Sequence, residues 1–261
     1  MTNGIQVSYQ SAVGTEAGNN MGVGKKLARA LDLDFLLSEE MRGVRLMLEY
    51  TRIHEILRVW RIVSTIVIFG SARTNENSTR GREAIWYREA RIFSRLASME
   101  GGAINDAGKD LENVIATGGG PGIMEAANRG AHEVGAPSIG FHVELRHEDH
   151  PNQYTTPELT FKCYYFSIRK LHLTMRANAL LVFPGGFGTI DELFELLTLV
   201  QTEKTPRIPI LLMDRQYWEK VIDFDYLIES NMISSEDLLY FQYVESGREA
   251  WELLKPRVCK A

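Results

Sequence analysis

The sequence predicts an α/β protein with a doubly wound, mostly parallel sheet, helices on both faces of that sheet, and a helical extension at the N-terminus. Short apolar runs rich in β-branched residues recur along the chain, as expected for strands buried on both faces. Helical segments alternate with these runs, which is the pattern of parallel βαβ units with right-handed crossovers. Three glycine-rich turns directly follow apolar runs, and the carboxyl ends of parallel strands are where such folds bind ligands.

The first 63 residues differ from the rest of the chain in composition and in the spacing of apolar residues. Residues 1–24 are rich in Gly, Ser, Asn and Thr without periodicity, which predicts a flexible tail. Residues 25–63 are predicted to form the helical extension, divided at Gly43. Within it, apolar residues three and four positions apart share one helix face: Leu46, Tyr50, Ile53, Leu57 and Trp60. That face either packs on the protein's own domain, contacts a second copy, or covers the site as a lid.

Residues 64–261 are predicted to form one Rossmann-like nucleotide-binding domain without internal repeats. The predicted strands are 65–69, 114–116, 138–143, 161–165, 179–183, 208–213 and 239–244. The predicted helices are 82–99, one starting at Pro121, 168–177, one ending near Val200, 217–228 and 248–254.

Composition narrows the choice of partners and location. The chain has 261 residues, is 44% hydrophobic and carries a net charge of −5 with scattered basic residues, which argues against a nucleic-acid partner. Cys163 and Cys259 lack CxxC spacing, so neither a zinc site nor a disulfide framework is expected. Residues 1–24 lack a signal-peptide pattern, and no apolar stretch reaches the roughly 20 residues of a membrane span. We therefore expect a cytoplasmic protein without a membrane partner.

The third glycine turn, Pro184-Gly185-Gly186-Phe187-Gly188-Thr189, joins a buried strand to a helix. Amides at a helix start are unpaired and lie at the positive end of the helix dipole, so they suit a phosphate. Glycines at 185, 186 and 188 allow a ligand to approach the main chain, and Thr189 adds a hydroxyl. There is no GKS or GKT of a Walker loop and no GxGxxG followed by a ribose-binding acid. The alternative is that the glycines only make tight turns.

The other two turns supply further candidates for substrate binding. The first contains Ser71, and the second contains Gly119 and Gly120. Pro121 is predicted as the first residue of the following helix, which places Glu125 one turn in. The Glu125 carboxylate either accepts hydrogen bonds from ribose hydroxyls or is simply a favourable acid near a helix start.

The glycine turns resemble the signatures of the LOG family of phosphoribohydrolases, long labelled lysine decarboxylases. Residues 184–192, PGGFGTIDE, resemble its PGGxGTxxE signature, and residues 118–126, GGGPGIMEA, resemble its other glycine signature. Arg169-Lys170 resembles the end of the family's MHERK stretch, and the resemblance covers about residues 64–244. The sequence departs from short members at Phe166-Ser167-Ile168, where they carry Met-His-Glu, and this leaves the preferred base open.

The resemblance implies hydrolysis of a nucleoside 5′-monophosphate, AMP-like or a cytokinin nucleotide, to free base and ribose 5-phosphate, without metal or cofactor. It also implies a homodimer with sites near the interface, and it assigns the catalytic pair to Arg169 and Glu192. N-glycosidic cleavage builds positive charge on the sugar, which a carboxylate such as Glu192 stabilises while it activates water or attacks directly. Arg169 does not readily donate a proton, so it orients Glu192 or contacts phosphate or ribose, and Lys170 is a further anion contact. The spacing Thr189-x-x-Glu192 also fits a helix capping box, and the two roles are compatible.

Several other functions are disfavoured by the residues. His142, His147 and His150 fall in one polar segment, and we expect a solvated surface there rather than a metal site. No GxSxG elbow is present, and a decarboxylase would need a lysine such as Lys170 in a pocket for pyridoxal phosphate, which nothing nearby supports. The main alternative is a non-catalytic protein of this fold that binds or carries a nucleotide or nucleotide cofactor. Such a binder need not keep both Arg169 and Glu192.

Overall fold

The computed structural model describes residues 32–104, 108–143 and 150–259, so the predicted tail lies outside the described residues. The chain forms two compact units, Met1–Arg45 and Leu46–Ala261. The described part of the first unit holds α2 (Leu33–Leu37), η1 (Glu39–Met41) and the start of α3 (Arg42–Val59). The predicted division at Gly43 is wrong, because Gly43 is the second residue of α3 and the break lies at the extended residue Ser38.

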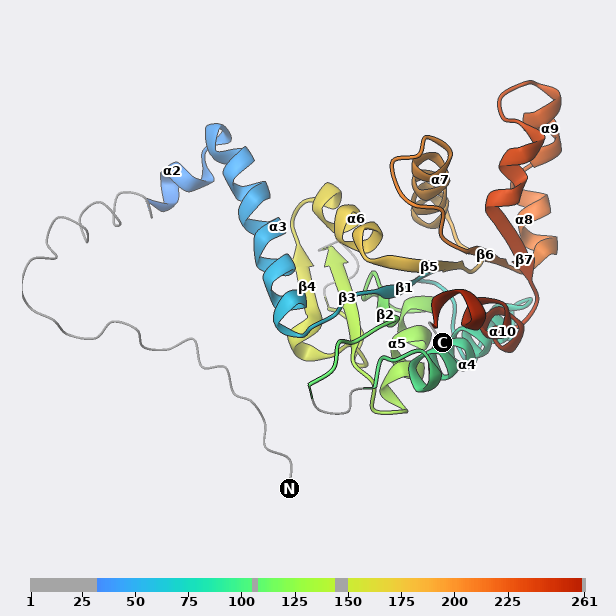
Figure 1. Ribbon diagram of the computed structural model, residues 1–261, viewed down its shortest axis with the longest axis horizontal. Helices are drawn as coiled ribbons and strands as arrows, with labels where there is room; N and C mark the ends of the chain where they lie inside the picture. Colours follow the sequence, from blue (N-terminus) through green and yellow to red (C-terminus); the bar gives the residue numbers. More distant parts are fainter. Residues whose placement is uncertain (1–31, 105–107, 144–149, 260–261) are drawn as a thin grey trace, which may run out of the picture. The chain divides into compact units, whose positions relative to one another are not determined.

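A seven-stranded parallel sheet forms the centre of the second unit and confirms the predicted fold class (Figure 1). Its strands run in the order β4-β3-β2-β1-β5-β6-β7. They are β1 (Thr65–Phe69), β2 (Val114–Thr117), β3 (Ser138–Val143), β4 (Thr160–Cys163), β5 (Ala177–Val182), β6 (Ile210–Met213) and β7 (Phe241–Val244). Every residue of β1, β2 and β3 is buried, as the unbroken apolar runs predict for strands covered on both faces.

Helices cover both faces of the sheet, as Figure 1 shows. On one face lie α4 (Glu83–Glu100), α5 (Ile123–His132) and α10 (Gly247–Val258), and on the other lie α6 (Phe166–Met175) and α7 (Phe187–Gln201). Short 3-10 turns η2 (Pro157–Leu159) and η3 (Ser235–Tyr240) precede β4 and β7. The single helix predicted at 217–228 is instead two, α8 (Arg215–Val221) and α9 (Phe224–Glu229). The chain is extended at Ile222, the C-cap residue of α8, and Asp223 caps α9 by accepting a hydrogen bond from the Tyr226 amide. No described helix combines the length and apolar character needed to cross a membrane.

The predicted apolar face of α3 packs on the protein's own domain from Leu46 onward. Ile53 and Leu57 are buried, and Leu46, Tyr50 and Trp60 are half-buried against the core. The same stretch also positions α6, because the Glu49 carboxylate accepts hydrogen bonds from the amides of Tyr164 and Tyr165 at 3.2 Å each. Tyr165 is the N-cap residue of α6, so α3 supports the helix that carries Arg169. A role of this extension in dimer contact or as a lid stays a prediction.

The strand order creates a switch point beside β1. The chain proceeds from β1 to β2 on one side, and β5 pairs with β1 on the other, so the loops after β1 and β5 diverge and leave a crevice. Ser71 connects the three glycine turns at this point. Its amide donates to the Pro184 carbonyl at 3.0 Å, and its carbonyl accepts from the Ile123 amide at 3.1 Å.

The second glycine turn ends later than the sequence predicts. Helix α5 begins at Ile123, with Gly122 as its N-cap residue, so Pro121 is not the first helical residue. Gly122 has φ 72°, and a Cβ on it would lie 2.3 Å from the Ser71 carbonyl oxygen. The close contact with the first turn keeps the chain in the loop conformation until Ile123.

Replacing Gly122 with alanine is therefore expected to destabilise the fold by at least about 2 kcal/mol, because the new methyl group meets backbone and the residue has positive φ. Gly186→Ala is the matched control, since a Cβ there would meet nothing within 4 Å. Urea unfolding of both variants measures the difference. Equal free energies of unfolding for Gly122→Ala and the wild type would contradict the close contact.

Candidate functional site

A cavity of about 680 Å³ opens at the switch point, within the size range of small-molecule sites. Seven of the predicted site residues line it: Ser71, Arg169, Gly185, Gly186, Gly188, Thr189 and Glu192. A larger cavity of about 930 Å³ lies at the β7 edge of the sheet, away from the switch point. We take the smaller cavity as the candidate site because the glycine turns after β1 and β5 both border it.

The turn after β5 presents the start of α7 to this cavity. Gly186 is the N-cap residue and no side chain caps the helix, so the amides of its first turn receive no side-chain acceptor. A Cβ at Gly186 or Gly188 would meet nothing within 4 Å, whereas one at Gly185 would lie 2.1 Å from Thr189 Oγ1. Gly185 therefore leaves room for the buried Thr189, while the other two glycines leave the helix start open to a ligand.

Arg169 from α6 and Glu192 from α7 meet in the wall of the cavity. Arg169 Nη2 lies 3.7 Å from Glu192 Oε1, an ion-pair distance longer than a hydrogen bond. Glu192 is 5% exposed and the Arg169 side chain is 15% exposed. The Arg169 Nε–H group is buried and has no acceptor among the described residues, and such a group is typically completed by water or a ligand.

Burial raises the pKa of Glu192 to about 7, against the opposing effect of the positive charges of Arg169 and Lys170. The carboxyl group therefore changes its protonation state near neutral pH. A carboxylate with such a raised pKa in a cavity is a recognised signal of an acid–base site.

The capping-box interpretation of Glu192 is wrong. Helix α7 begins at Phe187, so Thr189 is its third residue and Glu192 its sixth. A capping box needs Thr189 at the N-cap position, which Gly186 occupies. Glu192 therefore projects from the second turn toward Arg169 rather than back to the helix start.

Four predicted binding residues do not line the cavity, and the glycines among them already have protein partners. The Gly119 amide donates to Thr117 Oγ1 at 2.9 Å. The carbonyls of Gly119 and Gly120 accept from Asn152 Nδ2 at 3.1 and 2.9 Å. These contacts hold the second turn against the loop before β4, so Gly119 and Gly120 serve the turn itself.

Glu125 and Lys170 are the other two predicted binding residues that do not line the cavity. The Glu125 carboxylate accepts a hydrogen bond from the Tyr87 hydroxyl at 2.8 Å, which ties α5 to α4. Lys170 Nζ lies 2.7 Å from Asp191 Oδ2 and 2.9 Å from Glu195 Oε2, so it links α6 to α7 beside the catalytic candidates.

The cavity is also lined by side chains outside the predicted site, among them Trp86, His142, Phe166 and Tyr217. The expectation of a solvated His142 is wrong, since it lies on β3 and is 2% exposed. Its place in the apolar run 138–143 was the signal that it belongs to a strand. His150 is exposed, His147 lies outside the described residues, and no metal-binding group of His, Cys, Asp and Glu occurs among the described residues.

The fold and cavity together define an α/β protein with a cavity at the carboxyl edge of a parallel sheet. A family model described as "Possible lysine decarboxylase" matches residues 124–254, which is half of the chain. The chain belongs to this family, the LOG-type family that the glycine signatures indicate.

Curated relatives agree with this placement, and solved structures share the fold. Two cytokinin riboside 5′-monophosphate phosphoribohydrolases of Arabidopsis thaliana are similar, LOG3 at 24% identity and LOG4 at 25%. The matches cover 57% and 63% of this chain and 73% and 79% of the relatives. A molybdenum cofactor binding protein from Rippkaea orientalis shares the fold with TM-score 0.50 and 18% identity, over 75% of this chain and 98% of that one. The structural-genomics target TM1055 shares it with TM-score 0.52 and 16% identity, over 74% and 99%.

Proposed function

We propose that the protein hydrolyses the N-glycosidic bond of nucleoside 5′-monophosphates to free base and ribose 5-phosphate. The observation that carries the proposal is that the uncapped start of α7 and the Arg169–Glu192 pair border one cavity. A phosphate bound by the amides of that helix start leaves the attached ribose within the same cavity as the Glu192 carboxyl group. The phosphoribohydrolase activity named for the relatives supports the same reaction.

The bond that breaks joins C1′ of the ribose to the base nitrogen. Its electron pair leaves with the base, which takes up a proton, and water adds hydroxide to C1′. Positive charge develops on the sugar as the bond lengthens, so a carboxylate beside C1′ stabilises the transition state. In its ionised form Glu192 supplies that charge and accepts the proton of the attacking water.

Arg169 acts on Glu192 and on the ligand rather than as an acid. Its positive charge lowers the pKa of the buried Glu192 carboxyl and so keeps part of it ionised near neutral pH. The free Nε–H is a donor for a substrate oxygen. A guanidinium does not release its proton at this pH, so it does not protonate the leaving base.

Phe166 and His142 form part of the cavity wall. Phe166 lies in the segment that departs from short members of the LOG family, and the Arg169 guanidinium lies 5.5 Å from the centre of its ring. We propose that this part of the wall contacts the base, as aromatic side chains suit a flat ring. AMP-like and cytokinin nucleotides both remain candidates. We also propose that the protein forms a homodimer, as the resemblance to the LOG family implies.

The test is the release of free base from AMP, measured by chromatography from about pH 5 to pH 9. The release of base from adenosine is measured in the same way for comparison. We expect kcat/KM for AMP to rise with pH through a midpoint of about 7, because the ionised form of Glu192 is the active one. Adenosine is expected to be a poor substrate because it lacks the phosphate. A protein that binds AMP but releases no base from any nucleoside monophosphate would instead support the carrier alternative.

A further inference from the structure

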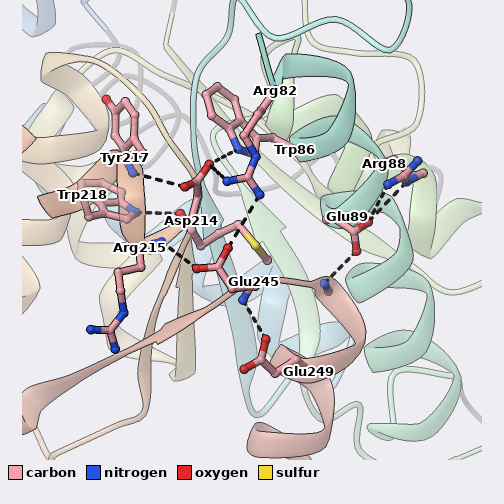
Figure 2. A network of polar contacts seen from close by, with 12 residues as sticks. Arg82, Trp86, Arg88, Glu89, Asp214, Arg215, Tyr217, Trp218, Glu245 and Glu249 are labelled. Atoms are coloured by element: carbon pink, nitrogen blue, oxygen red, sulfur yellow. Dashed lines mark hydrogen bonds and ion pairs between the residues drawn. The ribbon is translucent and has the colours of Figure 1, made fainter. Parts of the chain in front are cut away.

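A buried polar network around Asp214 connects α4 to the residues that follow β6 (Figure 2). Tyr217 extends this network to the glycine turn after β5. Its centre is Asp214, which directly follows β6 and has a side chain 3% exposed. Asp214 Oδ2 accepts from Trp86 Nε1 at 2.8 Å and lies 2.9 Å from Arg82 Nη1. The guanidinium of Arg82 supplies the opposite charge that a buried carboxylate needs.

Tyr217 connects this network to the glycine turn. Its amide donates to Asp214 Oδ1 at 3.2 Å, and its hydroxyl donates to the Gly185 carbonyl at 2.6 Å. Its ring meets that of Trp86 edge-on, with centroids 6.0 Å apart and planes at 70°. Burial raises the pKa of the Tyr217 hydroxyl, so the hydroxyl keeps the proton that it donates.

The contact to Gly185 restrains the peptide group that joins Gly185 to Gly186. Gly186 has no Cβ, and one built there would meet nothing within 4 Å, so the turn lacks side-chain packing at that residue. In a trans peptide the carbonyl and the following N–H point in opposite directions. Fixing the Gly185 carbonyl therefore fixes the direction of the Gly186 N–H, the amide just before the helix start.

We propose that Tyr217 is a positioning residue for the phosphate of the substrate, held in place by Asp214 and Trp86. The Tyr217 hydroxyl fixes the Gly185–Gly186 peptide in the orientation that binds phosphate. Asp214 sets the position of Tyr217 through its amide, and the Trp86 ring supports it from α4. This inference rests on the proposed use of the turn as a phosphate site, and it adds residues from two elements outside the glycine signatures.

Tyr217→Phe tests the proposal because it removes only the hydroxyl. Isothermal titration with ribose 5-phosphate is expected to show about fivefold weaker binding, the effect of one hydrogen bond. KM for AMP is expected to rise by the same factor with kcat within about twofold, because the contact acts on the phosphate and not on the reacting bond. Tyr226→Phe is the matched control, because Tyr226 is 63% exposed and lies on α9.

Trp86→Phe is the second variant, which keeps an aromatic ring but loses the hydrogen bond to Asp214. It is expected to weaken ribose 5-phosphate binding about twofold to threefold. Unchanged ribose 5-phosphate binding in both variants, or an equal loss of affinity for adenosine and AMP, would overturn the proposal. So would a wild-type protein that binds neither ribose 5-phosphate nor AMP. A wild type that binds AMP without hydrolysing it would refute the proposed function alone, and the affinity of Tyr217→Phe would still decide this inference.

Discussion

Replacing Glu192 with glutamine is expected to lower kcat for AMP hydrolysis by at least about 10³-fold while the protein stays folded and binds AMP. Glutamine has nearly the same shape, but it carries no charge to stabilise the developing cation and does not accept a proton from water. Steady-state kinetics and titration with AMP measure the two quantities separately. The large loss should fall on kcat, because the phosphate is held by the main chain of the neighbouring turn.

The same variant is expected to be more stable than the wild type above neutral pH. The folded-state pKa of about 7 exceeds the ordinary value of 4.5, so folding favours the protonated form. The stability contributed by Glu192 is therefore fully present below about pH 4.5 and is lost as the pH rises through about 7. Urea unfolding at pH 8 should favour Glu192→Gln by up to about 3 kcal/mol, a figure that already includes the effect of the Arg169 and Lys170 charges on the pKa of Glu192.

Glu252→Gln is the matched control, because Glu252 is an exposed residue of α10 on the opposite face of the sheet. It should change neither kcat nor the dependence of stability on pH. A Glu192→Gln protein with wild-type kcat would remove Glu192 from the chemistry.

Arg169→Ala is expected to lower kcat/KM for AMP by about 10²-fold to 10³-fold, because it removes a charge from the reacting centre. It should also move the midpoint of the pH profile upward, since the Arg169 charge opposes the effect of burial on the pKa of Glu192. Arg169→Lys should restore little activity, because an ammonium group lacks the planar set of donors of a guanidinium. Kinetics across pH measure both effects.

Arg248→Ala, at an exposed residue of α10, is the control for loss of one positive charge. It should leave the midpoint of the pH profile unchanged. A profile for Arg169→Ala with the wild-type midpoint would show that the guanidinium does not act on Glu192.

The local patterns were sufficient for the fold and for the sheet edge at which the cavity lies. The apolar runs at residues 65–69 and 179–183 correspond to β1 and β5, and the turns after them meet at the predicted sheet edge. Helix boundaries were less predictable. Pro121 and the Thr189-x-x-Glu192 spacing fit helix starts locally, but the helices begin at Ile123 and Phe187. The start at Ile123 depends on the contact of Gly122 with Ser71 of the first glycine turn.

By itself, the sequence determined the parallel α/β architecture and the glycine turns. Buried strands require runs of apolar residues and tight turns require glycine, and both patterns are visible in residues that are neighbours in the sequence. Only the tertiary structure decided which side chains meet. It brings Arg169 of α6 to Glu192 of α7, and Trp86 to Asp214 across 128 residues. It also buries His142, which a polar neighbourhood had suggested was solvated. Such pairings depend on how separate elements pack, and the burial that raises the pKa of Glu192 arises from the same packing.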